Sequence, residues 1–233
     1  LSFTGGTDKS SYRVTYGNAT ETYVLDNNKL KRNTISVNAN TQVTPKLLVG
    51  TAFTYTNSNS IRTQQGNQLS NPLFRAYFTP MSYDLTNIPF ETADGNQIWF
   101  NSEDHPYWSI KYNKYDDEVN RLIGSVNLKY DFTDWLTANL KVGTDYFTSK
   151  SSAIDEIGNR GGGNAGASSR LVGGIRESGS STRNVNSYFT LTGTRKYGDF
   201  TLTGTLGNEI LQNAFNFNTV DGYELIVPGF RNL

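Results

Sequence analysis

The chain has 233 residues, 21 basic and 21 acidic side chains and no cysteine, so its net charge is zero. A neutral chain has no strong field to attract nucleic acid, and the lack of cysteine excludes disulfides, thiolate zinc sites and cysteine nucleophiles. Thr (27), Asn (26) and Ser (20) make up close to a third of the residues and aromatic residues 13%, a composition that favours strands and turns, and no apolar run is long enough for a transmembrane helix.

Alternating apolar and polar residues predict eight strands in four hairpins. In chain order, the paired segments are residues 1–6 and 11–18, 35–41 and 47–55, 122–132 and 136–146, and 189–193 and 200–206. Tight turns are predicted near residues 8, 45, 134 and 198. Much longer links are predicted at 19–32, 57–119, 148–185 and from 208 onward, and the only helix signal is one possible turn at 117–122.

Strands of about ten residues with one apolar and one small-polar face are typical of a transmembrane β-barrel. The polar faces are too hydrophilic for a soluble sandwich core, so we expect them to line a watery lumen. The predicted lumen-facing residues are Asn38, Asn40, Asn127 and Asn139. The alternative is a soluble β-sandwich with one solvated face, whose strands also alternate.

Aromatic residues occur where a barrel has its interfacial girdles. Tyr130, Phe132 and Trp135 lie beside the turn at residue 134, whereas Tyr55 and Tyr146 lie at the opposite strand ends. We therefore predict short periplasmic turns and long extracellular loops.

Several short sequence motifs occur in order along the whole chain: GGTDK at 5–9, SNPLF at 70–74, TPMSYDL at 79–85, PF at 89–90, ADGNQ at 93–97, HPYW at 105–108, DEVNR at 117–121, LKYDFTDWL at 128–136 and LIVPGFRNL at 225–233. In these motifs the chain resembles the SusC/RagA family of TonB-linked (TonB-dependent) outer-membrane transporters. The resemblance implies an all-β fold, an antiparallel barrel of 22 strands with a plug inside. This chain would supply about eight of those strands.

The resemblance also implies a function and partners. It implies uptake of oligosaccharides or peptides across the outer membrane of a Gram-negative bacterium, with energy from TonB. It implies a SusD-like surface lipoprotein as a lid, contact with outer-membrane lipid, and no cofactor. We expect residues 1–233 to be a partial barrel domain that lacks the plug, the TonB box and the signal peptide. Two alternatives remain: a complete small eight-stranded barrel, or a soluble surface β-module that binds glycan.

Nothing in the sequence predicts an enzyme or a metal site. His105 is the only histidine, and one loop histidine beside Pro106 does not make a catalytic set of nucleophile, base and orienting acid. Asp116–Glu118 are adjacent, so their side chains diverge, and we interpret them as a strand-entry cluster rather than as metal ligands. Gly161, Gly163 and Gly166 match the letters of a dinucleotide fingerprint, but no apolar strand precedes them.

The link at 57–119 carries many aromatic residues and four prolines, which predicts a folded loop. Aromatic faces suit sugar rings or a protein partner. The candidate contact residues are Tyr83, Phe90, Trp99, Tyr107 and Trp108. Three roles are open for them: packing of the loop on itself, which we prefer, contact with a partner, or contact with substrate.

Overall fold

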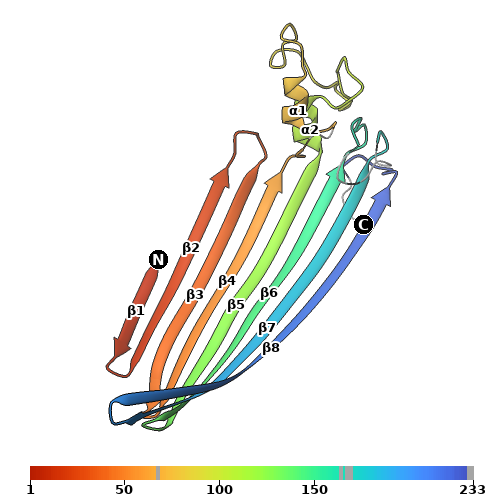
Figure 1. The fold of residues 1–233 in the computed structure, drawn as a ribbon. Coiled ribbons are helices and arrows are strands. Elements are labelled where there is room, and N and C mark those ends of the chain that lie inside the picture. The colour runs from red at the N-terminus through yellow and green to blue at the C-terminus, as the bar shows by residue number, and fades with distance from the viewer. Residues whose placement is uncertain (67–68, 163–164, 166–169, 230–233) are drawn as a thin grey trace.

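The computed structural model describes residues 1–66, 69–162, 165 and 170–229. Two glycines of the fingerprint match, Gly163 and Gly166, lie outside the described residues, as do residues 230–233 at the end of the last family-like segment. The eight strands form one antiparallel sheet in which each strand pairs with its neighbours in the sequence (Figure 1). The strands are β1 (Ser2–Thr7), β2 (Ser10–Thr22), β3 (Lys29–Thr44), β4 (Leu47–Arg62), β5 (Lys114–Thr133), β6 (Leu136–Asp155), β7 (Gly174–Tyr197) and β8 (Phe200–Tyr223).

The four predicted tight turns are confirmed, and each joins two strands through a two-residue connection. All four lie at one end of the sheet, whereas the longer links lie at the other end (Figure 1). The register shifts between Gln42 and Thr44 and between Asp131 and Thr133, just before two of the turns. Gly198 has φ of 61°, a value that glycine adopts without strain.

The strands are longer than predicted, because β2 to β8 have 13 to 24 residues rather than about ten. The predicted link at 19–32 shrinks to residues 23–28, and the predicted helical turn at 117–122 lies inside β5. Stretches such as 56–60 and 148–152 are polar on both faces. They give no alternation signal, yet their backbone continues the hydrogen-bonded ladder.

Two short helices, which the sequence did not predict, lie in the link between β4 and β5. They are α1 (Pro72–Tyr77) and α2 (Pro106–Tyr112), and both carry proline in the first turn. The Asn71 side chain caps α1 by accepting from the backbone N–H groups of Leu73 (3.0 Å) and Phe74 (3.2 Å). No helix among the described residues has the length and apolar character needed to cross a membrane.

The register divides the sheet into two chemically different faces, because residues directly paired across strands point to the same side. We call one side the apolar face: Tyr12, Val14, Tyr16, Ile35, Val37, Val49, Phe53, Tyr55, Leu122, Val126, Leu128, Tyr130, Leu140, Val142 and Tyr146. The other side, the polar face, carries Asn38, Asn40, Ser125, Asn127, Lys129, Asn139 and Lys141.

The buried core lies at the loop end of the molecule, in the links and in the strand ends next to them. The buried apolar side chains among the described residues are Trp108, Ile110, Tyr115, Ile154, Ala165 and Ile175, all at the end opposite the tight turns. Leu206 on the apolar face is 70% exposed and Ile35 is 46% exposed. The apolar face is therefore left uncovered by the chain itself.

Candidate functional site

The apolar face forms a band between two rows of aromatic residues. From Leu122 to Phe132, β5 runs about 33 Å at about 3.3 Å per residue. At a strand tilt of about 40°, this stretch is about 25 Å tall, which matches the apolar band of a transmembrane barrel.

The upper aromatic row lies at the edge of the band nearer the long links, and two of its tyrosines form side-chain hydrogen bonds. Tyr16, Ile35, Tyr55, Leu122 and Tyr146 are paired in register across five strands. The hydroxyl of Tyr55 donates to Oδ1 of Asn120 (2.7 Å), and that of Tyr16 donates in the same way to Oδ1 of Asn33 (2.9 Å).

Each accepting asparagine also takes a second hydrogen bond. Asn57 Nδ2 donates to Asn120 Oδ1 (2.8 Å), and Asn18 Nδ2 donates to Asn33 Oδ1 (2.7 Å). The same pattern, a tyrosine and an asparagine two residues apart against a facing asparagine, thus occurs twice. It marks the level at which this face changes from apolar to polar.

The lower row lies beside the tight turns. The rings of Tyr130 and Phe132 pack edge to face with centroids 4.8 Å apart. The guanidinium of Arg195 lies 4.6 Å from the centre of the Trp135 ring. The two predicted aromatic groups therefore lie at the two edges of the band; that they contact a membrane interface stays a prediction. Tyr55 and Tyr146 do not end their strands, since β4 and β6 continue to Arg62 and Asp155.

The four predicted lumen residues share the polar face. Asn40 and Asn127 lie on either side of Gly50 in one row, and a Cβ at Gly50 would come within 2.8 Å of Asn40 Oδ1. Higher on this face, Arg121 forms a bidentate ion pair with Asp145 at 2.9 and 2.6 Å. That Asn38, Asn40, Asn127 and Asn139 line a lumen remains a prediction.

Five apolar side chains that the sequence did not single out lie on the polar face, spread among polar residues. They are Ile123, Phe147, Leu211, Phe215 and Phe217. Phe215 and Phe217 are 67% and 62% exposed. The signal was present in the sequence, because Phe215 and Phe217 are out of phase with Leu202 and Leu206 in the same strand.

The link between β4 and β5 folds around a buried polar network. Trp108 is 1% exposed, and its Nε1 donates to the Gly95 carbonyl at 2.9 Å. Gln97 Nε2 donates to Asp104 Oδ1 (2.6 Å), while Gln97 Oε1 accepts from the backbone N–H of His105 (2.8 Å). These contacts hold the link as a folded unit, as the sequence predicted.

His105 is fully buried and caps α2, since its Nδ1 accepts from the Tyr107 backbone N–H at 3.1 Å. Burial lowers the pKa of His105 to about 4. Its other ring nitrogen, Nε2, has no hydrogen-bond partner among the described residues. A neutral, buried histidine that caps a helix is explained by its structural role.

The candidate contact residues mostly pack on one another. Tyr83 and Trp99 have ring centroids 5.0 Å apart, and Phe90 and Tyr107 have theirs 6.0 Å apart. Trp108 packs on Tyr112 at 5.0 Å. These contacts are what the self-packing interpretation expects; contact with substrate or partner stays a prediction.

Of the candidate contact residues, Tyr107 is 38% exposed, and the other exposed apolar side chains of this link are residues that sequence reasoning did not single out. Tyr77 is 87% exposed and Met81 is fully exposed, with Leu73, Phe78 and Phe100 also at the surface.

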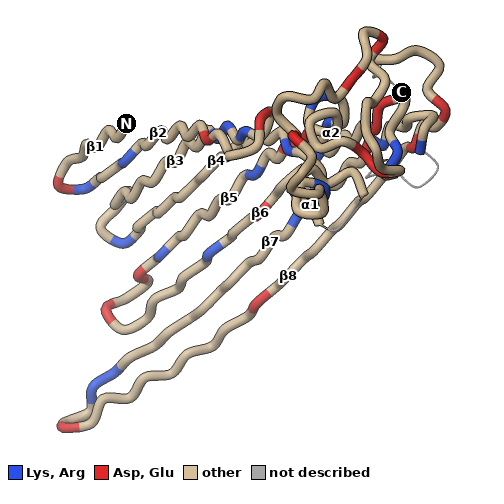
Figure 2. Tube along the Cα trace, turned by 90° about the horizontal axis from the view of Figure 1, so that it is seen from above, with Lys and Arg blue, Asp and Glu red and all other residues tan. Residues whose placement is uncertain are grey.

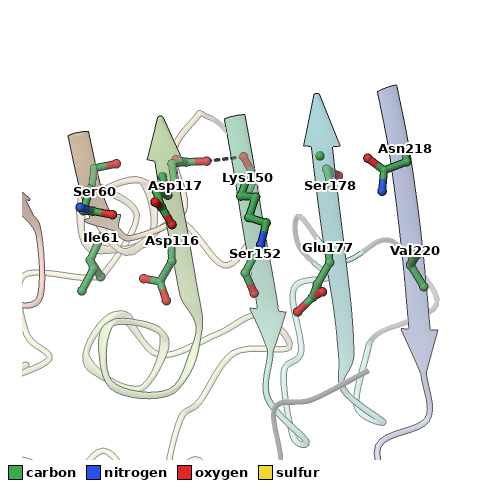
Figure 3. Close-up of a pocket in the computed structure, with 14 residues that line it drawn as sticks. Ser60, Ile61, Asp116, Asp117, Lys150, Ser152, Glu177, Ser178, Asn218 and Val220 are labelled. Carbon is green, nitrogen blue, oxygen red and sulfur yellow. Dashed lines mark hydrogen bonds between the residues drawn. The ribbon is translucent and has the colours of Figure 1, made fainter. Parts of the chain in front are cut away.

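A groove lies on the apolar face above the upper aromatic row (Figure 3). We call it the upper groove; it has a volume of about 480 Å³ and runs across β4 to β8. The side chains that line it from the apolar face are Asn59, Ile61, Asp116, Glu118, Lys150, Ser152, Glu177, Asn218 and Val220, together with Gly179. A second hollow of about 570 Å³, lined by Asn120, Thr148, Ser181 and Asn216, adjoins it below.

Charged residues gather at the tight turns and around the loop end, and the middle of the sheet carries few of them (Figure 2). Among the described residues, no group of three or more potential ligands is placed to hold a metal ion. Asp116–Glu118 lie in β5, where successive side chains alternate between the two faces.

Three solved structures of the RagAB peptide importer have the same fold. The chain matches the importer in its "closed-closed" state over 97% of its length, with 17% identity and a TM-score of 0.72. A second RagAB structure gives 16% identity and a TM-score of 0.73, and the "open-open" state gives 17% identity over 96% of the chain with 0.74. No family model and no curated protein matches the chain.

The structural match confirms, at the level of fold, the predicted likeness to RagA-type barrels. The all-β antiparallel architecture is likewise confirmed. The chain spans about a quarter of the length of the solved chains it matches, at 25%.

Proposed function

We propose that this chain is a wall segment of the barrel of a TonB-linked outer-membrane importer of the SusC/RagA type. One observation carries the proposal: a single antiparallel sheet presents a band about 25 Å tall, apolar on one face and bounded by aromatic rows, with small polar residues on the other. Lipid would cover the apolar face, and the polar face would line the lumen. A soluble sandwich would need a second layer over the apolar face, and the described part of the chain supplies none.

The cargo we propose is a peptide, with an oligosaccharide as the alternative. The solved structures that share this fold belong to a peptide importer, and this supports the first choice. The segment contributes no chemistry of its own; transport requires only a path and a gate. The importer that we propose also contains a plug, energy coupling through TonB and a SusD-like lipoprotein lid.

The lid would meet the loop end, where the link between β4 and β5 is folded and rigidly packed. This link presents Tyr77, Phe78 and Met81 to solvent. Exposed apolar side chains on a folded surface are typical of interaction sites.

Fractionation of cells that express the full-length protein tests the proposal. We expect the protein in the outer membrane as a heat-modifiable barrel, and we expect its deletion to abolish uptake of either labelled peptides or labelled oligosaccharides. Recovery in the soluble fraction would refute the transporter assignment. Loss of oligosaccharide uptake alone would replace the peptide cargo with the alternative.

A further inference from the structure

The upper groove lies on the lipid side of the proposed barrel wall and not on the cargo side. Along β5, every second residue points to the same face, so Leu122 in the apolar band is followed upward by Asn120, Glu118 and Asp116 on that face. The polar face, which would line the lumen, lies on the other side of the sheet. A transported solute in the lumen therefore does not reach this groove.

A glycine lies at the floor of the groove. Lys150, Gly179 and Asn218 are paired in one row across β6, β7 and β8. A Cβ at Gly179 would lie 2.5 Å from Oδ1 of Asn218, so any larger residue would have to displace that amide and would fill the hollow. The hollow between Lys150 and Asn218 therefore depends on this position.

The lining is rich in groups that hydrogen-bond to hydroxyls. Three carboxylates, those of Asp116, Glu118 and Glu177, face one ammonium, that of Lys150. None of the ion pairs among the described residues involves these four side chains.

The charge balance selects the kind of headgroup that fits. An excess of carboxylates repels phosphate, whereas carboxylate and amide oxygens accept hydrogen bonds from sugar hydroxyls. Ile61 and Val220 supply apolar surface at the two ends of one row, suited to the C–H face of a sugar ring. A neutral sugar unit matches this combination of groups.

Continuity with the apolar band identifies the source of the sugar. The second hollow, with Asn120 and Asn216, connects the upper groove to the row of Tyr55 and Leu122 at the edge of the band. A lipid whose acyl chains lie on the band would place its headgroup at this level.

We infer that the upper groove binds a neutral sugar of an outer-leaflet glycolipid. The inference rests on the proposed function, because it needs the apolar face to be embedded in a membrane. A bound headgroup would anchor the strands β5 to β8, which extend beyond the band into water.

The full-length transporter, purified in mild detergent, provides the test. Native mass spectrometry counts the copies retained of glycolipid extracted from the host outer membrane, with phosphatidic acid as the phosphate-only lipid. Gly179→Leu fills the groove, and Gly204→Leu is the matched control. Gly204 lies on the same face, paired with Gly193 near the lower aromatic row, where a Cβ would meet nothing within 4 Å. The double variant Asp116→Asn, Glu177→Gln removes two carboxylates without changing shape.

We expect wild type and Gly204→Leu to retain glycolipid, and Gly179→Leu and the double variant to lose most of it. If Gly179→Leu does not assemble, the isosteric double variant decides. Equal glycolipid retention by wild type and the double variant overturns the inference, as does equal retention of phosphatidic acid and glycolipid. If one of these retention results overturns the inference while the variants still reach the outer membrane and import cargo, the proposed function stands. A wild-type chain absent from the outer membrane refutes the proposed function itself.

Discussion

Acidification should open the folded link between β4 and β5 through His105. The imidazole is fully buried, with ring centroids of Trp99, Phe90 and Tyr107 at 4.4, 5.6 and 5.9 Å. The nearest carboxylate in sequence, Asp104, already accepts from Gln97 and from the Arg160 backbone N–H. Protonation would turn the accepting Nδ1 into a donor and would break the cap of α2.

The magnitude follows from the pKa of His105, which is about 4 in the folded link, whereas an exposed histidine has its ordinary pKa of 6.5. At pH 7 the His105 imidazole is mostly neutral in both the folded and the opened link, so the pKa difference contributes almost nothing to the folding stability of the link. As the pH falls through 6.5, His105 binds a proton in the opened link but stays neutral in the folded link. The folding stability of the link therefore declines until the pH reaches the pKa of His105 in the folded link. The loss is about 2 kcal/mol at pH 5 and about 3 kcal/mol at pH 4.

Limited proteolysis of the full-length protein measures this effect, because cleavage of a briefly opened segment follows the opening equilibrium. At pH 5, opening of the wild-type link should be favoured about twentyfold more than at pH 7. His105→Asn keeps a side-chain acceptor at the cap and does not titrate, so its cleavage should lack this increment. Equal pH dependence in wild type and His105→Asn would refute the reasoning.

Three further predictions test the band, the link core and the cap. Val126→Lys places a charge in the middle of the apolar band and should cost about 2–4 kcal/mol of folding stability, whereas Asn127→Lys on the polar face should cost little, as measured by urea unfolding in lipid. Equal effects would contradict the assignment of the two faces. Trp108→Ala should destabilise the link by about 3–5 kcal/mol in a thermal unfolding assay, with Tyr77→Ala at the exposed surface as the near-neutral control. Asn71→Ala removes both bonds to the start of α1 and should cost about 1 kcal/mol, seen as faster proteolysis of the link; an unchanged rate would show that the cap is dispensable.

The two faces of the sheet were predictable because their signal is local. A strand turns every second side chain to the same side, so Leu136 to Tyr146 reveals its apolar and polar faces without any knowledge of its neighbours. The tight turns were predictable for the same reason, since a turn interrupts the alternation and carries its own residue preferences. The predicted glycine fingerprint at Gly163 and Gly166 lies outside the described residues.

Strand ends and loop packing were not predictable in this way. Above the band both faces of β4 to β8 meet polar surroundings, so the residues lose their periodic contrast while the backbone ladder continues. The side-chain contacts of the link join residues far apart in sequence, such as Gln97, whose Nε2 donates to the Gly158 carbonyl at 2.9 Å. Burial of His105 and Trp108 depends on such contacts.

The sequence by itself therefore determined the number of strands, their hairpin pairing and the apolar face, because these depend on neighbours along the chain. The tertiary structure alone decided where the strands stop, which aromatic residues of the link are buried, and on which side of the wall the upper groove opens. The physical reason is that register across five strands brings Asn59, Glu118, Lys150, Gly179 and Asn218 into one row. No local pattern in the sequence encodes that row.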